Sequence, residues 1–257
     1  MIYTLLNSYK KYLQDKYTLA TSETYYKRLS SLFVGQSLTD TIAQLDFDKI
    51  LDHLKQIKYK NHFSQYKNAL LHFCEFQDII LPFEVLEKIK ELAASTKKKY
   101  RNLQAINYPA IDKKIKHIKN KKLKISYQTM LATGLRVSEL ASISLSDCII
   151  VDDKIIFNFQ EKGGTFEIMA ICQTEYPKLY ADIEWLVLNT KANKKIFYSA
   201  IYLQIKAKEL NFKCHDLRRI YAHIEYKKTK SKETVMKKLR HTNIKNTNKY
   251  LRTRVKF

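Results

Sequence analysis

Apolar side chains recur every three to four residues along most of this chain, which is the spacing of one face of an α-helix. The first part of the chain predicts five helices, over residues 2–16, 24–33, 46–57, 61–76 and 82–94. Thr21 to Glu23 offer a polar start to the second helix, Gly35 a C-cap, and Pro82 a first-turn residue for the fifth. With only four glycines and three prolines, a turn-dense all-β fold is excluded and helix is expected to dominate.

The spacing of the apolar residues changes once, in the middle of the second half of the chain. After helical patterns over 108–118, 124–132 and 136–143, three short runs rich in β-branched and aromatic residues predict strands over 148–151, 154–159 and 165–171. Helical patterning then resumes at Pro177. We therefore expect a mainly α (α+β) chain: an N-terminal helical bundle, then a mostly helical domain with a small three-stranded antiparallel sheet.

Positive charge is concentrated in the second part of the chain. The formal net charge is +22, yet residues 1–95 hold 12 Lys and Arg against 11 Asp and Glu, whereas residues 96–257 hold 35 against 14. A polyphosphate backbone is the usual partner of such a surface, because each neutralised phosphate releases counterions. A basic solubilising surface, ribosome association and attraction to an anionic membrane are the alternatives.

The most basic window suggests a linker. Residues 95–124 hold ten lysines and Arg101 against one acidic residue, Asp112. We predict domains over 1–94 and 109–257, joined by a basic linker over 95–108 that crosses a DNA backbone; a merely solvated tether is the alternative. Its candidate DNA contacts are Lys97, Lys98, Lys99 and Arg101.

The chain has no run of about 18 apolar residues and no signal-peptide pattern at its start, so we expect a cytoplasmic protein that does not span a membrane. The four cysteines, Cys74, Cys148, Cys172 and Cys214, are widely spaced, with no C-x-x-C pair. Buried free thiols are expected instead of a disulfide framework or a zinc site.

Two segments of the second domain combine arginine with residues that can hold it. In ATGLRVSEL, Gly134 permits a sharp turn that aims Arg136 outward, and Glu139 can hold the guanidinium from one turn on. In HDLRR, His215 and Arg218 share a helix face, where a phosphate is the natural occupant. Each alone has a plain alternative: an arginine paired with its i+3 glutamate, and a surface pair unrelated to DNA.

Two further features carry little weight alone. Lys162 lies at the predicted tip of the second β-turn, ahead of Gly163 and Gly164, where a lysine is usually just solvated but can also reach a groove as a proton donor. His241, in LRH, is followed nine residues later by Tyr250, one of 18 tyrosines and structural by default.

Taken in order, ATGLRVSEL, the hairpin lysine, HDLRR, and LRH plus nine residues to the tyrosine of NTNKYL resemble the tyrosine recombinase (phage integrase) family. The resemblance covers residues 109–257. Less specifically, TSETYYKRLSSLF and QYKNALLHFCEF look like the core-binding domain of Xer-type members, a helical DNA-binding domain.

The resemblance implies roles for individual residues. Tyr250 would be the nucleophile, Arg136 and Arg218 would clamp the scissile phosphate with His215 and His241 as hydrogen-bond partners, and Lys162 would be the general acid. Gly134 and Glu139 would support them, and Arg219 and Arg240 are candidate DNA contacts.

The implied reaction cuts and rejoins DNA through a 3′-phosphotyrosyl intermediate and a Holliday junction, without metal, ATP or other cofactor. A phenol, with a pKa of about 10, needs a base and a positive field to attack at neutral pH. Arginines can supply that charge, the sequence offers no carboxylate cluster to hold a metal, and it has no P-loop.

Two departures from the family pattern bear on backbone and assembly. The family commonly has glycine before the second histidine, where this chain has Arg240. Only seven residues follow Tyr250, so we expect a monomer in solution that assembles into a tetramer on two DNA sites with inverted repeats, in the nucleoid. A partner recombinase or accessory protein is an open alternative to acting alone.

Three hypotheses about the function remain at this point. The first is a site-specific recombinase. The second keeps the chemistry in a type IB topoisomerase-like or telomere-resolving enzyme. The third is a non-catalytic DNA-binding relative, although a binder needs neither Lys162 nor Tyr250.

Overall fold

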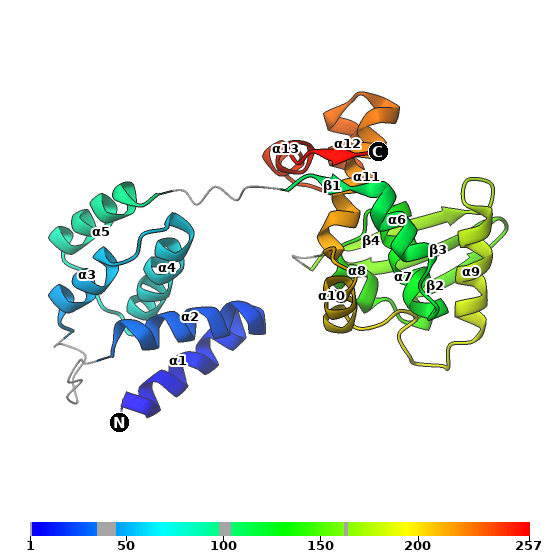
Figure 1. The fold of residues 1–257 in the computed structure, drawn as a ribbon. Coiled ribbons are helices and arrows are strands. Elements are labelled where there is room, and N and C mark those ends of the chain that lie inside the picture. Colours follow the sequence, from blue (N-terminus) through cyan, green and yellow to red (C-terminus); the bar gives the residue numbers. More distant parts are fainter. Residues whose placement is uncertain (1, 35–44, 98–103, 162–163) are drawn as a thin grey trace. The chain divides into compact units, whose positions relative to one another are not determined.

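The computed structural model describes residues 2–34, 45–97, 104–161 and 164–257. The chain divides into two compact units, residues 1–101 and 102–257, drawn in Figure 1. No helix among the described residues is long and apolar enough to cross a membrane.

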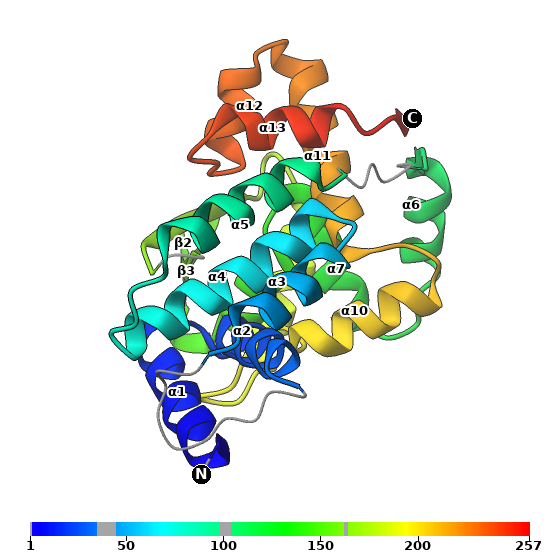
Figure 2. The ribbon, with the colours of Figure 1, turned by 90° about the vertical axis from the view of Figure 1, so that its left-hand side faces the viewer.

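Unit 1 is a helical bundle. Its helices are α1 (Ile2–Lys16), α2 (Leu19–Leu32), α3 (Phe47–Lys55), α4 (Lys60–Phe76) and α5 (Phe83–Ser95), which Figure 2 shows from the side of this unit. The apolar stripes that predicted them face one another: Tyr9, Leu29, Leu70 and Phe73 are all buried. Tyr9 also donates from its hydroxyl to the Ala69 carbonyl oxygen at 3.1 Å, which satisfies its polar end within the core.

Four of the five predicted helix starts in unit 1 differ from the structure, those of α3 and α4 by one residue, at Phe47 and Lys60. The second helix begins at Leu19 rather than Thr24, and Ser22 lies buried inside it because its hydroxyl donates to the carbonyl oxygens of Leu13 and Thr18. Pro82 is the N-cap of α5 rather than its first-turn residue, with an extended ψ of 141°. The predicted cap at Gly35 lies outside the described residues.

Unit 2 is mostly helical around one small sheet. In chain order it contains β1 (Ile106–Asn107), α6 (Tyr108–Lys116), α7 (Lys121–Thr133), α8 (Val137–Ser142), the 3₁₀ turn η2 (Leu145–Asp147), β2 (Cys148–Val151), β3 (Lys154–Gln160), β4 (Phe166–Cys172), α9 (Pro177–Leu188), α10 (Ala200–Glu209), α11 (Cys214–Thr229), α12 (Lys232–Lys238), α13 (Ile244–Leu251) and β5 (Val255–Lys256). This is the predicted mainly α fold, with the three-stranded antiparallel sheet in the order β2-β3-β4.

The sheet has one buried face. Along β3, Ile155, Phe157 and Phe159 are buried and alternate with more exposed residues, as the two-residue period of a half-buried strand requires. Helices α8 and α9 pack against this strand. At its far end Gln160 pairs with Phe166 of β4, which closes the described part of the β3–β4 hairpin.

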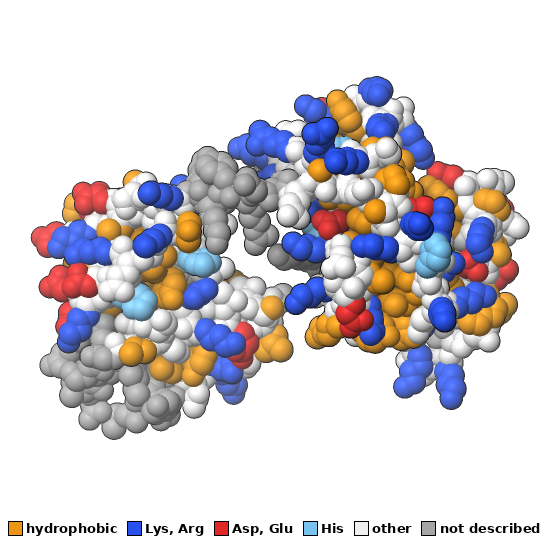
Figure 3. Space-filling view, viewed as in Figure 1, with side chains coloured by type: hydrophobic (Ala, Val, Ile, Leu, Met, Phe, Trp, Pro, Cys, Tyr) orange, Lys and Arg blue, Asp and Glu red, His pale blue; other side chains and the backbone are white. Residues whose placement is uncertain are grey.

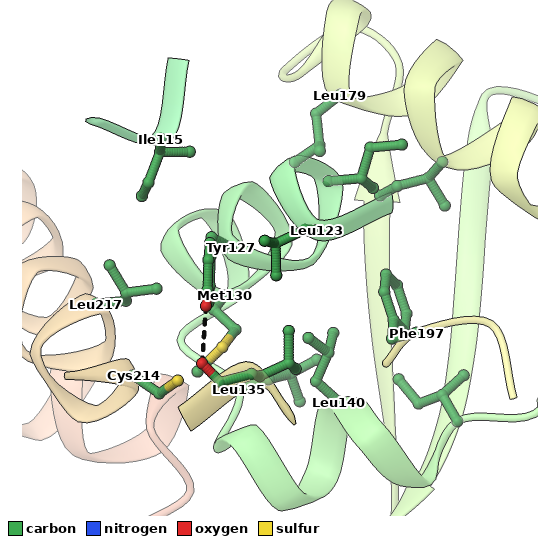
Figure 4. Packing of buried hydrophobic residues seen from close by; sticks show 14 of the residues in the cluster. Ile115, Leu123, Tyr127, Met130, Leu135, Leu140, Leu179, Phe197, Cys214 and Leu217 are labelled. Carbon is green, nitrogen blue, oxygen red and sulfur yellow. Dashed lines mark hydrogen bonds between the residues drawn. The ribbon is translucent and has the colours of Figure 1, made fainter. Parts of the chain in front are cut away.

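Helices α7 and α11 form the centre of unit 2. They pack against each other, and α7 buries Leu123, Tyr127 and Met130 on one face (Figure 4) and Ile125 and Thr129 on the opposite one. The Tyr127 hydroxyl donates to the Leu203 carbonyl oxygen at 2.7 Å (Figure 4). The polar end of this buried side chain is therefore hydrogen-bonded. This core fixes the two helices whose ends carry the motif residues.

The two ends of unit 2 pair in a way that the sequence pattern does not predict. Strand β5 runs parallel to β1, with Val255 opposite Ile106. The Ile106 amide donates to the Arg254 carbonyl oxygen at 2.8 Å, and the rings of Tyr108 and Phe257 meet edge to face. The residues that follow Tyr250 are therefore held against the start of their own unit.

All four cysteines are free, as predicted. Cys74 and Cys214 are buried, whereas Cys148 and Cys172 are only half-buried, so the expectation of full burial is right for two of the four.

Candidate active site

The turn before α8 depends on Gly134. Gly134 has φ of +65°, and a Cβ added there would lie 2.3 Å from a ring carbon of Tyr221. Both the left-handed backbone and the close ring of Tyr221 therefore require glycine. The turn leaves Arg136 as the N-cap of α8, where its side chain is half-buried.

Glu139 is the anion at the centre of the site. Its side chain is only 1% exposed, and it accepts hydrogen bonds from the Arg136 amide at 2.7 Å and from the Arg136 guanidinium. Burial acts to raise the pKa of Glu139, but these two hydrogen bonds and the charges of Arg136 and Arg218 outweigh it, so its pKa lies below the usual value. Glu139 is a carboxylate at neutral pH.

Arg218, on α11, is fully buried. Its guanidinium donates to the carbonyl oxygens of Gly134 and Leu239 and lies 3.8 Å from Glu139 Oε2. Burial and the charge of Arg136 lower its pKa to about 10, which still leaves it charged at neutral pH. Within the part of the chain that the structure describes, its buried Nε has no hydrogen-bond partner.

Tyr250 lies close to both motif histidines. It is buried on α13, and its ring centroid is 4.9 Å from that of His215 and 5.0 Å from that of His241. The Arg218 guanidinium carbon is 5.9 Å from the centre of the same ring. Helices α11, α12 and α13 pack against one another, which brings residues 32 to 35 positions apart in sequence into one cluster.

Both histidines are neutral at pH 7. His215 is exposed at the surface, but the protein packed around its ring and the charges of Arg219 and Arg218 lower its pKa to about 4. Burial and the charges of Arg218 and Arg136 lower the pKa of His241 to about 4 as well. A hydrogen bond of 2.9 Å between His241 Nδ1 and Thr247 Oγ1 holds that ring in place.

The lowered pKa of His241 predicts a pH-dependent stability. An unfolded histidine titrates near 6.5, so between about pH 6.5 and 4 the unfolded chain binds more protons and stability falls as pH falls. From pH 7 to pH 5 the loss due to His241 is about 2 kcal/mol. Urea unfolding of His241→Asn should lose less stability over this interval than the wild type does; an equal loss would contradict the assignment.

The other candidate DNA contacts are distributed differently. Arg219 pairs with Asp216 at 3.0 Å. Arg240 points inward, with its side chain 10% exposed, and pairs with Glu161 and Glu139. Lys97 belongs to unit 1, where its backbone bonds to the Lys58 carbonyl oxygen and the Lys60 amide and its side chain is exposed. Lys98, Lys99, Arg101 and the candidate acid Lys162 lie outside the described residues.

Sequence reasoning missed three contributors to this site: Glu161, Tyr221 and Thr247. Tyr221 sets the space at Gly134, and Thr247 holds His241. Glu161 lies 2.9 Å from Arg240 Nε and 3.6 Å from Arg136 Nη1. Only its position beside Lys162 could have drawn attention to Glu161, because its partners are remote in sequence.

A cavity of about 550 Å³ opens beside the arginines. Arg136, His215 and Arg218 line one part of it, and Lys208 and Lys213 add two more cations, while no carboxylate of the described residues lines it. The surface view adds that Lys and Arg side chains gather over the part of the unit that holds α12 and α13 (Figure 3). Met130, Leu135, Val137 and Phe212 line much of the remainder, so only the cationic part of the cavity suits an anion.

No group of three or more His, Cys, Asp or Glu side chains that could hold a metal ion occurs within residues 2–34, 45–97, 104–161 and 164–257.

Solved structures with the same fold include several recombinases. The chain is similar to XerH bound to its difH substrate in a pre-cleavage complex (TM-score 0.59, 14% identity, 90% of this chain and 74% of that one). It is similar to a lambda integrase dimer bound to a COC′ core site (TM-score 0.62, 15% identity, 96% and 94%). It is also similar to the Tn1549 transposon integrase in complex with transposon right end DNA (TM-score 0.60, 16% identity, 96% and 94%).

A search of curated protein sequences found no match. The model of the Phage integrase family, in contrast, matches residues 101–256. That range contains the Gly134 turn, the arginines, both histidines and Tyr250, and it spans more than half of the chain. The protein therefore belongs to the phage integrase family, as its sequence motifs predicted.

Proposed function

We propose that this protein is a site-specific DNA recombinase that cuts and rejoins strands through a 3′-phosphotyrosyl intermediate and a Holliday junction. The observation that carries the proposal is the position of Tyr250, whose ring centre lies 4.9 Å from the His215 ring, 5.0 Å from the His241 ring and 5.9 Å from the Arg218 guanidinium carbon. A buried phenol in such surroundings is suited to nucleophilic attack on an anion.

Two arginines supply the charge that the phosphate requires. Arg218 remains charged and keeps a buried Nε–H free for an acceptor within the described structure, and Arg136 lies at the rim of the same cavity. Their guanidiniums would bind the nonbridging oxygens and stabilise the charge that grows on the five-coordinate phosphorus. Glu139, paired with both, would fix their orientation.

The attack forms a bond between Tyr250 Oη and phosphorus and breaks the bond from phosphorus to the 5′ oxygen. The phenolic proton passes to a neutral imidazole, His215 or His241, whose pKa rises when the anionic phosphate enters. Lys162, in the role that the family resemblance implies, gives a proton to the leaving 5′ oxygen. Attack by a 5′ hydroxyl reverses these steps, and the phosphodiester energy is retained throughout.

Double-stranded DNA is the proposed substrate. The net positive charge of residues 96–257 supports it, and the similar XerH, lambda integrase and Tn1549 integrase structures hold DNA. We assign residues 1–94 to core binding, 95–108 to the linker and 109–257 to catalysis. Two sites with inverted repeats would each bind two protomers, which gives a tetramer assembled from monomers; a lambda integrase tetramer bound to a Holliday junction has the same fold.

Covalent capture tests the proposal and identifies the target sequence in the same experiment. The purified chain is incubated with sheared genomic DNA of its source organism and denatured in SDS, and DNA that stays attached to protein is sequenced. We expect one recurrent sequence, with protein attached to the 3′ end created at the break and a free 5′ hydroxyl on the other side. A nicked duplex of that sequence should then trap the adduct, since the short strand beyond the nick diffuses away.

The alternatives give different results. Adducts scattered over unrelated sequences, together with relaxation of supercoiled plasmid, would favour a topoisomerase-like enzyme. Bound DNA with no SDS-resistant adduct on any sequence would contradict catalysis and leave a DNA-binding protein.

A further inference from the structure

The two carboxylates of the candidate site each contact more than one guanidinium. Glu139 pairs with Arg136 and lies 3.2 Å from Arg240 Nη2. Glu161 Oε1 lies 2.9 Å from Arg240 Nε and 3.6 Å from Arg136 Nη1. With Arg218 beside Glu139, three arginines and two carboxylates form one group with a net charge of +1.

Of the two arginines that share both acids, Arg136 lines the cavity and Arg240 does not. The Arg136 side chain is 28% exposed and that of Arg240 only 10%. Arg240 Nη1 donates to the Lys238 carbonyl oxygen at 3.3 Å, and its guanidinium carbon lies 5.0 Å from the centre of the Phe159 ring. All three nitrogens of the Arg240 guanidinium are therefore hydrogen-bonded within the protein.

The backbone at Arg240 is one that favours glycine. Its φ of +53° lies in the left-handed region, which L residues with a side chain adopt only at some cost. Arg240 directly precedes His241, whose ring lies beside that of Tyr250. Its side chain is held in this conformation by its contacts, so the two carboxylates indicate what the guanidinium does.

Both acids can also bind Arg136. A guanidinium whose charge is balanced by two carboxylates attracts a further anion less strongly. Glu161 lies closer to Arg240 than to Arg136, and Glu139 is shared between the two arginines. Without Arg240, the ion pair with Arg136 is the one that Glu161 retains among the described residues, and the net charge of the group falls from +1 to zero.

We propose that Arg240 is a positioning residue, which engages Glu161 and Glu139 and thereby leaves Arg136 available to bind the scissile phosphate. The inference rests on the proposed function, in which Arg136 binds that phosphate. Arg240 itself contacts no DNA and transfers no proton in this role. It acts through the charge and the orientation of Arg136.

The test removes the arginine and then the acid that competes for Arg136. Arg240→Met keeps an apolar stem, and Arg240→Gly suits the left-handed backbone. On a saturating nicked duplex of the captured target sequence, we expect each variant to form the adduct about 30-fold more slowly, within the range of about 10–100-fold typical of groups that orient the ligands of a charged centre. Adding Glu161→Gln to either variant restores the net charge and should return the rate to within about threefold of wild type.

Lys238→Met is the matched control. Lys238 stands two residues before Arg240 and pairs with the buried Glu225, so this variant removes an equal charge from the same segment. It should keep the adduct rate within about twofold of wild type, and Glu161→Gln should not accelerate it. Thermal unfolding of every variant gives the folded fraction, to which each rate is referred.

Several outcomes would overturn the inference. A slow Arg240 variant that Glu161→Gln does not accelerate, or loss of the fold in both Arg240 variants, would assign the arginine to the fold. A wild-type rate in both would leave it no role in the reaction, and equal slowing of Lys238→Met would point to charge in general. Absence of any adduct with the wild type is a different result, because it contradicts the proposed function itself.

Discussion

Replacing Tyr250 with phenylalanine is expected to abolish the SDS-resistant adduct completely while DNA binding stays within about twofold of wild type. The change removes one oxygen, the atom that would bond to phosphorus. The ring keeps its contacts with His215 and His241, so the surrounding structure should not change. The measurement pairs adduct yield on the trapped nicked duplex with a gel-shift titration on intact DNA.

Tyr226→Phe is the matched control. Tyr226 lies on α11 and packs against the same small cluster of buried residues as Tyr250, so the variant removes an equivalent oxygen from the same region. It should form the adduct at the wild-type rate. An adduct that persists in Tyr250→Phe would move the nucleophile to another residue and contradict the assignment.

Replacing Arg218 with methionine is expected to lower both catalysis and stability. Loss of one charged donor at a reacting oxyanion typically costs about 10²–10³-fold in rate, and we expect adduct formation to fall by that amount. The same change leaves the carbonyl oxygens of Gly134 and Leu239 without their donor and removes one cation beside the buried Glu139. Unfolding in urea should show a loss of about 3 kcal/mol.

Arg218→Lys separates the two effects. Lysine keeps the positive charge beside Glu139 but lacks the fork that reaches two carbonyl oxygens at once. It should therefore recover part of the stability and little of the rate. A methionine variant that is as stable as the wild type would show that the buried guanidinium is not needed by the fold, and an unchanged rate would remove it from the phosphate site.

Much of the fold follows from local pattern. The helical period identified all five helices of unit 1, and the switch to a two-residue period located β2, β3 and β4 within one or two residues. The predicted helix boundaries were less accurate than the predicted helices themselves, because tertiary contacts decide where a helix such as α2 begins. Ser22 looked like a cap, yet it is buried in the helix because Leu13 and Thr18 carbonyl oxygens accept its hydroxyl.

The candidate site also combines features that the sequence could predict with features that it could not. The turn at Gly134 and the shared face of His215 and Arg218 are local, and sequence spacing could predict them. The pairing of Arg240 with Glu161 joins positions 79 residues apart and has no local signal. Its discovery required the packed structure, since charge complementarity in a chain with 47 basic residues does not identify partners.

The parallel pairing of β1 with β5 has a mechanical consequence. In a parallel pair both chains enter from the same end, so the segment that leads into unit 2 and the segment that leaves α13 arrive side by side at Ile106 and Arg254. A load along the incoming chain therefore acts on β1, the strand that is bonded to β5. Tyr250 stands five residues before β5, so tension at the entrance of the unit reaches the segment that carries Tyr250 through this strand pair.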